Sequence, residues 1–89
     1  MTDAAALKAR VREAVEAHRD AVVSLARDVR DEPELGYKEF ETERKVAAAF
    51  ESMGLDVETG LAVTGVRARI GSGSPVLAVL GELDALVNP

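Results

Sequence analysis

Glu82 and Asp84, near the end of the chain, are the residues whose type and spacing are best suited to chemistry. They follow a nearly continuous Val/Leu/Ala run at 76–80, which is typical of a strand buried on both faces. Residues just past the carboxyl end of such a strand lie at the rim of the sheet, where open α/β folds usually build their sites. Because residues two apart in an extended chain point the same way, both carboxylates can face one pocket.

Carboxylates so placed can bind a metal, act as a general acid/base pair, or orient a histidine ligand. A solvated strand end is the alternative without chemistry. His18, the only histidine, lies on or beside an apolar helix stripe, which is more typical of a packed or edge residue than of a ligand. A metal site needs three or four converging ligands, and the sequence has no cysteine. We therefore predict that this segment alone binds no catalytic metal tightly.

Two helices are predicted ahead of these carboxylates. Apolar residues at alternating three- and four-residue steps predict one long helix over 4–30, which Pro33 prevents from continuing. A second helix is predicted over 39–53, with Gly54 adopting positive φ just after its end. The acidic stretch at 31–36 is predicted to be a tight turn closed by its last residue, a glycine, and its acids lack the spacing of a calcium loop.

About three strands are predicted after the helices: 55–58, 63–70 and the buried run at 76–80. The Gly-Ser-Gly-Ser-Pro stretch at 71–75 is interpreted as the turn of an antiparallel hairpin over 63–81. It lacks the lysine and the following helix of a phosphate-binding loop. The predicted fold class is α/β, with two helices on one side of the first strands of a larger mixed sheet.

Composition narrows the classes of partner. A formal net charge of −5 argues against nucleic acid and against anionic membrane surfaces. No stretch approaches the ~20 apolar residues of a membrane span. The first thirty residues carry charges throughout and contain no apolar core of a signal peptide, so a cytoplasmic protein is expected.

Three short motifs occur in order along the chain: P-E-L-G-x-x-E-x-x-T at 33–42, T-G-V at 64–66 and E-L-D-A-L at 82–86. In this combination they resemble the M20 metallopeptidase/amidohydrolase family, in particular its aminobenzoyl-glutamate hydrolase branch. The resemblance covers roughly residues 18–87.

The resemblance implies both an architecture and an activity. Family members are several times longer, so residues 1–89 are expected to be the N-terminal part of a zinc-peptidase-like catalytic domain. The rest of that domain and a dimerisation domain would lie outside this sequence. Such enzymes cleave amide bonds of N-acyl amino acids, dipeptides or aminobenzoyl-glutamate-like small molecules. They use a water bound to a divalent metal, zinc or else manganese or cobalt, and the full-length enzyme is expected to be a homodimer.

The resemblance also assigns individual residues. Asp84 matches the aspartate that lies beside the metal centre and is counted among the catalytic residues. Glu82 stands where many members have a metal-binding histidine, but the branch resembled here has an acid there, so Glu82 is a weaker candidate for the metal. Glu32 stands where members often have a histidine before P-E-L-G. The family's later H-A-C-G-H ligand segment and its Glu-Glu pair, which holds the general base, are not among these residues. Since a hydrolytic zinc site needs about three protein ligands and a base, we predict that the 89-residue chain alone hydrolyses nothing.

A small acidic α/β interaction or regulatory module, associating through its long N-terminal helix, is the alternative from another class. The helix stripe and the small size allow it. It leaves the three ordered motifs unexplained.

Overall fold

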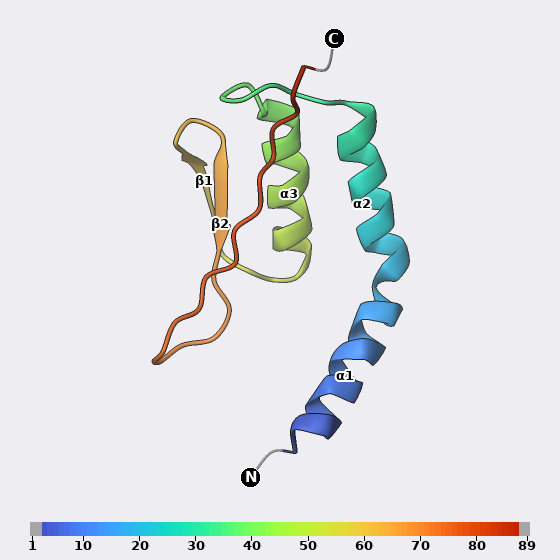
Figure 1. Cartoon of the computed structure of the whole chain (residues 1–89). Helices are drawn as coiled ribbons and strands as arrows, with labels where there is room; N and C mark the ends of the chain where they lie inside the picture. Colours follow the sequence, from blue (N-terminus) through green and yellow to red (C-terminus); the bar gives the residue numbers. More distant parts are fainter. Residues whose placement is uncertain (1–2, 88–89) are drawn as a thin grey trace. The chain divides into compact units, whose positions relative to one another are not determined.

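The computed structural model describes residues 3–87. Its elements, labelled in Figure 1, are in order α1 (Ala4–Ala17), α2 (Arg19–Asp31), α3 (Phe40–Ser52), β1 (Val57–Leu61) and β2 (Gly65–Ala68). They form two units, the first ending at Arg30 and the second beginning at Asp31. Helices followed by antiparallel strands confirm the predicted α/β class.

The first unit contains two helices where one was predicted. Asp3 caps α1 by accepting a hydrogen bond from the Ala5 N–H at 3.0 Å. His18 then leaves helical geometry, with φ −104° and ψ 5°. The backbone hydrogen bonds from His18 to Ala14 (3.1 Å) and from Val22 to His18 (3.0 Å) nevertheless run through this point. The prediction of one continuous helix is therefore wrong by a single residue. No proline or glycine at this position indicates an interruption.

The apolar stripe of these two helices is largely at the surface. Its members Leu7, Val11, Val15 and Val22 are between 42% and 62% exposed. Neither helix contains a buried residue. None of the helices within residues 3–87 is long and apolar enough to cross a membrane. An exposed stripe of this kind is the feature that an interaction module would use.

The second helix predicted from the sequence is confirmed as α3, and its ending follows the expected chemistry. Gly54 has φ +78°. Its N–H donates to the Glu51 carbonyl at 2.9 Å, and the Leu55 N–H donates to the Phe50 carbonyl at 3.3 Å. These are the two hydrogen bonds of a Schellman motif, which satisfies carbonyls that a helix end would otherwise leave unpaired.

The hairpin lies earlier in the chain than predicted. β1 pairs antiparallel with β2, with Val57 opposite Ala68 and Leu61 opposite Gly65. The predicted hairpin over 63–81 is therefore wrong. Glycine and serine at 71–74 favour a turn there, whereas the actual turn contains no glycine: Ala62 and Val63 adopt positive φ, of 46° and 79°.

Gly60, predicted as a break between strands, lies inside β1. The register shifts between Glu58 and Leu61, and Gly60 has φ +73° within that interval. An irregularity with an extra residue in one strand is a β-bulge, for which a glycine in this conformation is well suited.

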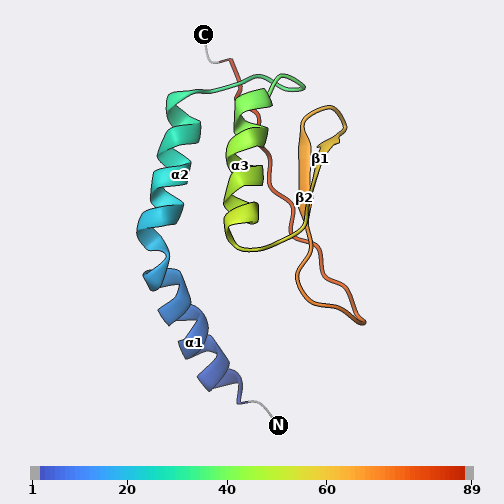
Figure 2. The same ribbon diagram turned by 180° about the vertical axis from the view of Figure 1, so that it is seen from behind.

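The predicted buried strand at 76–80 is wrong. The chain after β2 forms no regular element through residue 87, and in both views it runs back past β2 and α3 (Figures 1 and 2). Val76, Leu77, Val79 and Leu80 are 69–93% exposed. A strand requires a neighbour to satisfy its backbone, and the sheet among the described residues consists of β1 and β2 alone.

The core of the second unit is small and unusually polar. α3 packs against both strands. Three described side chains are buried there, those of Thr42, Ala47 and Thr64, which are 1%, 7% and 2% exposed. Because two of the three carry hydroxyl groups, hydrogen bonds must satisfy them inside the core.

Candidate functional site

The two candidate carboxylates lie on an extended stretch. Glu82 and Asp84 are exposed, whereas Leu83 and Ala85 are half-buried. This alternation is the one expected of an extended chain, in which neighbouring side chains point to opposite sides. Glu82 and Asp84 therefore lie on the more exposed side of the stretch, although the stretch is not part of a sheet.

This stretch lies against the loop that carries the P-E-L-G residues. The Ala85 N–H donates a hydrogen bond of 2.6 Å to the backbone carbonyl of Glu34. A Cβ placed on Gly36 would lie 4.0 Å from Oδ2 of Asp84. The structure thus brings together the first and third sequence motifs, which are separated by about fifty residues of chain.

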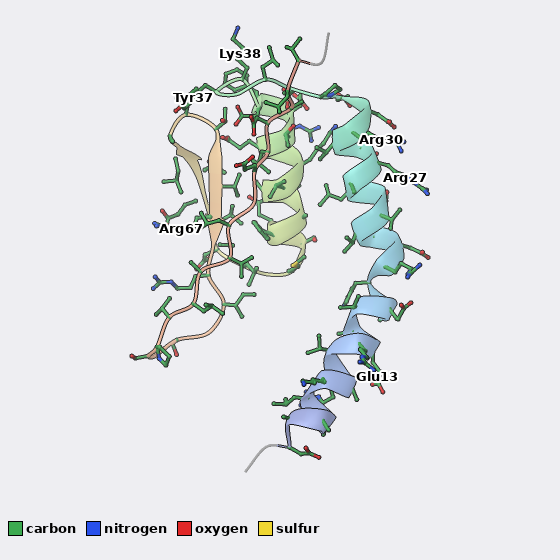
Figure 3. The ribbon with its side chains drawn as sticks, in the orientation of Figure 1. Glu13, Arg27, Arg30, Tyr37, Lys38 and Arg67 are labelled. Atoms are coloured by element: carbon green, nitrogen blue, oxygen red, sulfur yellow. The ribbon has the colours of Figure 1, made fainter. Side chains whose placement is uncertain are left out.

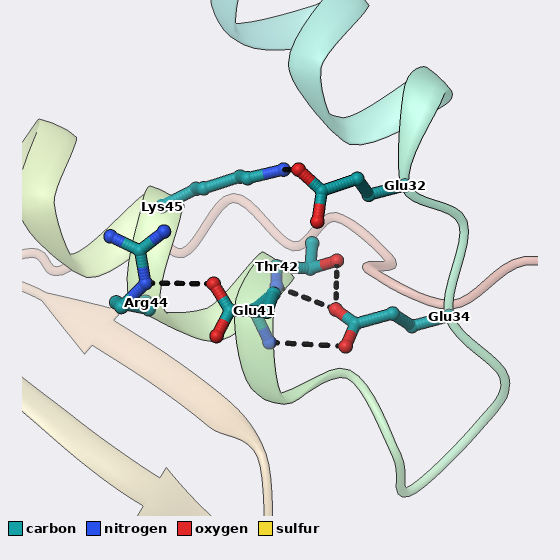
Figure 4. A network of polar contacts seen from close by, with 6 residues as sticks. All are labelled: Glu32, Glu34, Glu41, Thr42, Arg44 and Lys45. Atoms are coloured by element: carbon teal, nitrogen blue, oxygen red, sulfur yellow. Dashed lines mark hydrogen bonds and ion pairs between the residues drawn. The ribbon is translucent and has the colours of Figure 1, made fainter.

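The Glu34 side chain joins the same loop to the start of α3 (Figure 4). Its Oε1 accepts from both the hydroxyl and the backbone N–H of Thr42, each at 2.6 Å, and its Oε2 accepts from the Glu41 N–H at 3.1 Å. The first N–H groups of a helix have no partner within the helix, and a carboxylate there is also favoured by the helix dipole. Glu34 therefore caps α3 from outside the helix.

Glu39 makes the corresponding link to the hairpin. Its Oε2 accepts a 2.8 Å hydrogen bond from the hydroxyl of Thr64. Thr64 is the first residue of the T-G-V motif and immediately precedes β2. The three motifs are thus connected by hydrogen bonds, and the two buried hydroxyls of the core each donate to a motif glutamate.

Sequence reasoning missed these four polar residues. Glu34, Glu39 and Thr42 are the polar residues of the P-E-L-G-x-x-E-x-x-T motif. The residues alone indicate only a turn at this loop. A glutamate a few residues ahead of a helix that has a threonine in its first turn was the available signal. The partner of Thr64 could not be seen, because it lies twenty-five positions earlier in the chain.

The pKa of Glu34 is lowered, chiefly by the hydrogen bond from the Thr42 hydroxyl. Burial opposes this effect, while the backbone N–H groups of Thr42 and Glu41 and the charge of Lys45 reinforce it. An unfolded glutamate titrates at about 4.3. Since the folded pKa is the lower one, ionised Glu34 stabilises the fold above that range, and this stabilisation is lost as the pH falls through the folded pKa.

We therefore expect Thr42→Val to raise the titration midpoint of Glu34. The hydroxyl donor is removed while the shape of the side chain is nearly kept. ¹³C NMR titration of the Glu34 carboxyl carbon in both proteins measures the difference. Identical midpoints would contradict the hydrogen bond as the main cause of the lowered pKa.

The loop departs from the sequence prediction at its tip. The residue with positive φ is Tyr37, at 62°, and not Gly36. Figure 3 shows Tyr37 and Lys38 projecting outward from the loop, and Tyr37 is 70% exposed. Glu32, in the position where family members often have histidine, forms an ion pair with Lys45 at 3.1 Å.

The described residues do not by themselves make a metal centre. No group of three or more His, Cys, Asp or Glu side chains able to hold a metal ion occurs within residues 3–87. Glu82 and Asp84 supply carboxylates from one stretch, and His18 is an exposed residue at the junction of α1 and α2. A hydrolytic zinc site needs a larger donor set than these carboxylates offer.

Comparison with known proteins identifies several amide hydrolases. "IAA-amino acid hydrolase ILR1-like 4" of Arabidopsis thaliana is 41% identical over 68 residues, covering 75% of this chain and 16% of that protein. A polypeptide of the p-aminobenzoyl-glutamate hydrolase of Escherichia coli is 37% identical over 78 residues, covering 85% and 16%. "Thermostable carboxypeptidase 2" of Saccharolobus solfataricus is 33% identical over 70 residues, covering 75% and 18%.

The chain thus spans between 16% and 18% of the length of these relatives. No family model matches it, and no solved structure matches it significantly. The relatives share one family, the family to which the three ordered motifs pointed. The chain belongs to the M20 family of metallopeptidases and amidohydrolases.

Proposed function

We propose that this chain is part of a metal-dependent hydrolase that cleaves amide bonds in small molecules. N-acyl amino acids, dipeptides and aminobenzoyl-glutamate-like compounds are the substrate class. The names of the relatives support the reaction type, since they describe hydrolases of amino acid conjugates and a carboxypeptidase. The observation that carries the proposal is the hydrogen bond between Ala85 and Glu34, which joins the candidate site to the P-E-L-G loop.

In this proposal Asp84 is the catalytic-site residue and Glu82 has the weaker claim to the metal. Both are exposed on the same extended stretch, so they are accessible to groups that come from outside the described residues. The metal, zinc or else manganese or cobalt, would take its other ligands from such groups. It would supply an activated water for attack on the amide carbonyl. The homodimer and the cytoplasmic location expected from the resemblance and the composition belong to the same proposal.

The proposal predicts different behaviour for the 89-residue chain and for a longer protein containing it. The short chain should hydrolyse nothing and should bind zinc far more weakly than nanomolar, because its donor set is too small. Sequencing the gene past the codon for Pro89 should reveal H-A-C-G-H and a Glu-Glu pair in frame. The encoded protein should release amino acids from N-acyl amino acids, lose this activity to a chelator and regain it with zinc, manganese or cobalt.

Either of two results would contradict the proposal. One is stoichiometric nanomolar zinc in the 89-residue chain, measured by calorimetry. The other is a stop codon directly after Pro89.

The interaction module is kept as a second candidate because the stripe on α1 is exposed. Leu7, Val11 and Val15 are 42%, 60% and 62% exposed, and such a stripe can bury itself against a second helix. A stop codon after Pro89 together with a helical dimer in sedimentation equilibrium would favour this candidate. A monomeric chain would count against it.

A further inference from the structure

Glu34 is held at two points that serve different parts of the fold. Its carboxylate is held by the start of α3, through the hydroxyl and N–H of Thr42 and the N–H of Glu41. Its backbone carbonyl accepts the Ala85 N–H. One residue therefore connects a buried anchor in the core to the stretch that carries the candidate carboxylates.

The anchor is firm because of where Thr42 lies. Its side chain is 1% exposed, and its hydroxyl and N–H both donate to the same oxygen of Glu34 at 2.6 Å. Hydrogen bonds to an ionised acceptor are shorter and stronger than those between neutral groups. The other end of the loop is fixed as well, since Glu39 accepts from Thr64 beside β2.

The held stretch, in contrast, belongs to no strand, and Asp84 and Leu86 are exposed on either side of the half-buried Ala85. The close approach of Gly36 to Asp84 places this carboxylate directly beside the loop. A movement of the Glu34 carbonyl would therefore move Asp84.

We propose that Glu34 is a positioning residue for Asp84, and that the buried Thr42 hydroxyl fixes Glu34 in the orientation that holds residue 85. This inference rests on the proposed role of Asp84 in hydrolysis. Misplacing a reacting group by about 1 Å costs roughly 100-fold in rate, so loss of the anchor should lower kcat. KM should change little, because an interaction that acts on the transition state alone leaves substrate binding unaltered.

The first test uses the 89-residue chain and needs no activity. Thr42→Val removes the hydroxyl, and Thr42→Ser restores it. Amide hydrogen exchange by NMR should show protection of the Ala85 N–H falling by about tenfold in the valine variant and returning in the serine variant. Ala47→Gly, which weakens α3 without touching Glu34, serves as the control for general destabilisation.

The second test uses the longer enzyme proposed above. Thr42→Val should lower kcat by about tenfold with KM within twofold, and Thr42→Ser should restore kcat. Unchanged Ala85 protection in Thr42→Val, or an equal fall in Ala47→Gly at matched stability, overturns the inference. Reduced protection with unchanged kcat overturns it too. If Asp84→Asn is then also without effect, the failure lies in the proposed function and not in the contact between Glu34 and Ala85.

Discussion

In the longer hydrolase proposed above, replacing Asp84 with asparagine is expected to lower kcat by roughly 10- to 100-fold, the usual cost of losing a group that orients metal ligands. The substitution keeps the size of the side chain and removes its charge. Asp84 is exposed, so the fold should tolerate the change. Steady-state kinetics on an N-acyl amino acid, with metal content measured in the same samples, give the comparison.

Asp56→Asn is the matched control for this experiment. Asp56 is also exposed, lies in the connection between α3 and β1, and belongs to none of the three motifs. The same chemical change there should leave kcat within about twofold of the unsubstituted enzyme, as expected for surface substitutions. Full activity of the Asp84 variant at full metal content would show that Asp84 has no catalytic role.

A third variant separates the two carboxylates. Glu82 lies two residues before Asp84 on the same exposed side of the stretch. If Glu82 binds the metal directly, Glu82→Gln should lower metal content before it lowers kcat per metal. If it only accompanies Asp84, metal content should stay constant. Metal content and kcat per bound metal therefore distinguish the two possible roles of Glu82.

Local signals in the sequence predicted local structure well. The apolar positions of α3 and the glycine after it define both the helix and its end, because a Schellman motif involves only the last turn and the two residues beyond it. The strand predicted over 63–70 is likewise present, in shorter form, as β2. The sequence contains no comparable signal for the interruption at His18, since no residue there strongly disfavours a helix.

The predictions that failed concern interactions between distant parts of the chain. The apolar run at 76–80 was predicted to be a buried strand, yet its side chains are exposed because residues 3–87 provide no third strand to pair with it. A hydrophobic pattern indicates that a segment needs another segment to pack against, but it does not provide that segment. The Glu34–Thr42 and Glu39–Thr64 hydrogen bonds were missed because no strong pattern in the sequence marks either pair. Each residue looks ordinary alone, and only the fold shows its partner.

The largest effect on stability is expected at Gly65, at the start of β2. A Cβ there would overlap the backbone carbonyl oxygen of Leu61, and it would lie only 3.1 Å from the Leu61 Cβ. Leu61 and Gly65 are directly opposed in the hairpin, so neither can move without opening the strand pair. The glycine of T-G-V is therefore required by close backbone approach, since Gly65 has no positive φ that would otherwise explain it.

Gly65→Ala should accordingly destabilise the second unit by about 2–3 kcal/mol, the upper part of the range for overpacked sites. A core with only three buried side chains among the described residues has little stability to lose, so urea unfolding followed by circular dichroism should show a clearly lowered midpoint. Gly81→Ala is the matched control, because a Cβ there meets nothing within 4 Å. It should stay within about 0.5 kcal/mol of the unsubstituted chain. Equal midpoints for the two alanine variants would show that β1 and β2 do not approach so closely at Gly65, and the hairpin register would then have to be different.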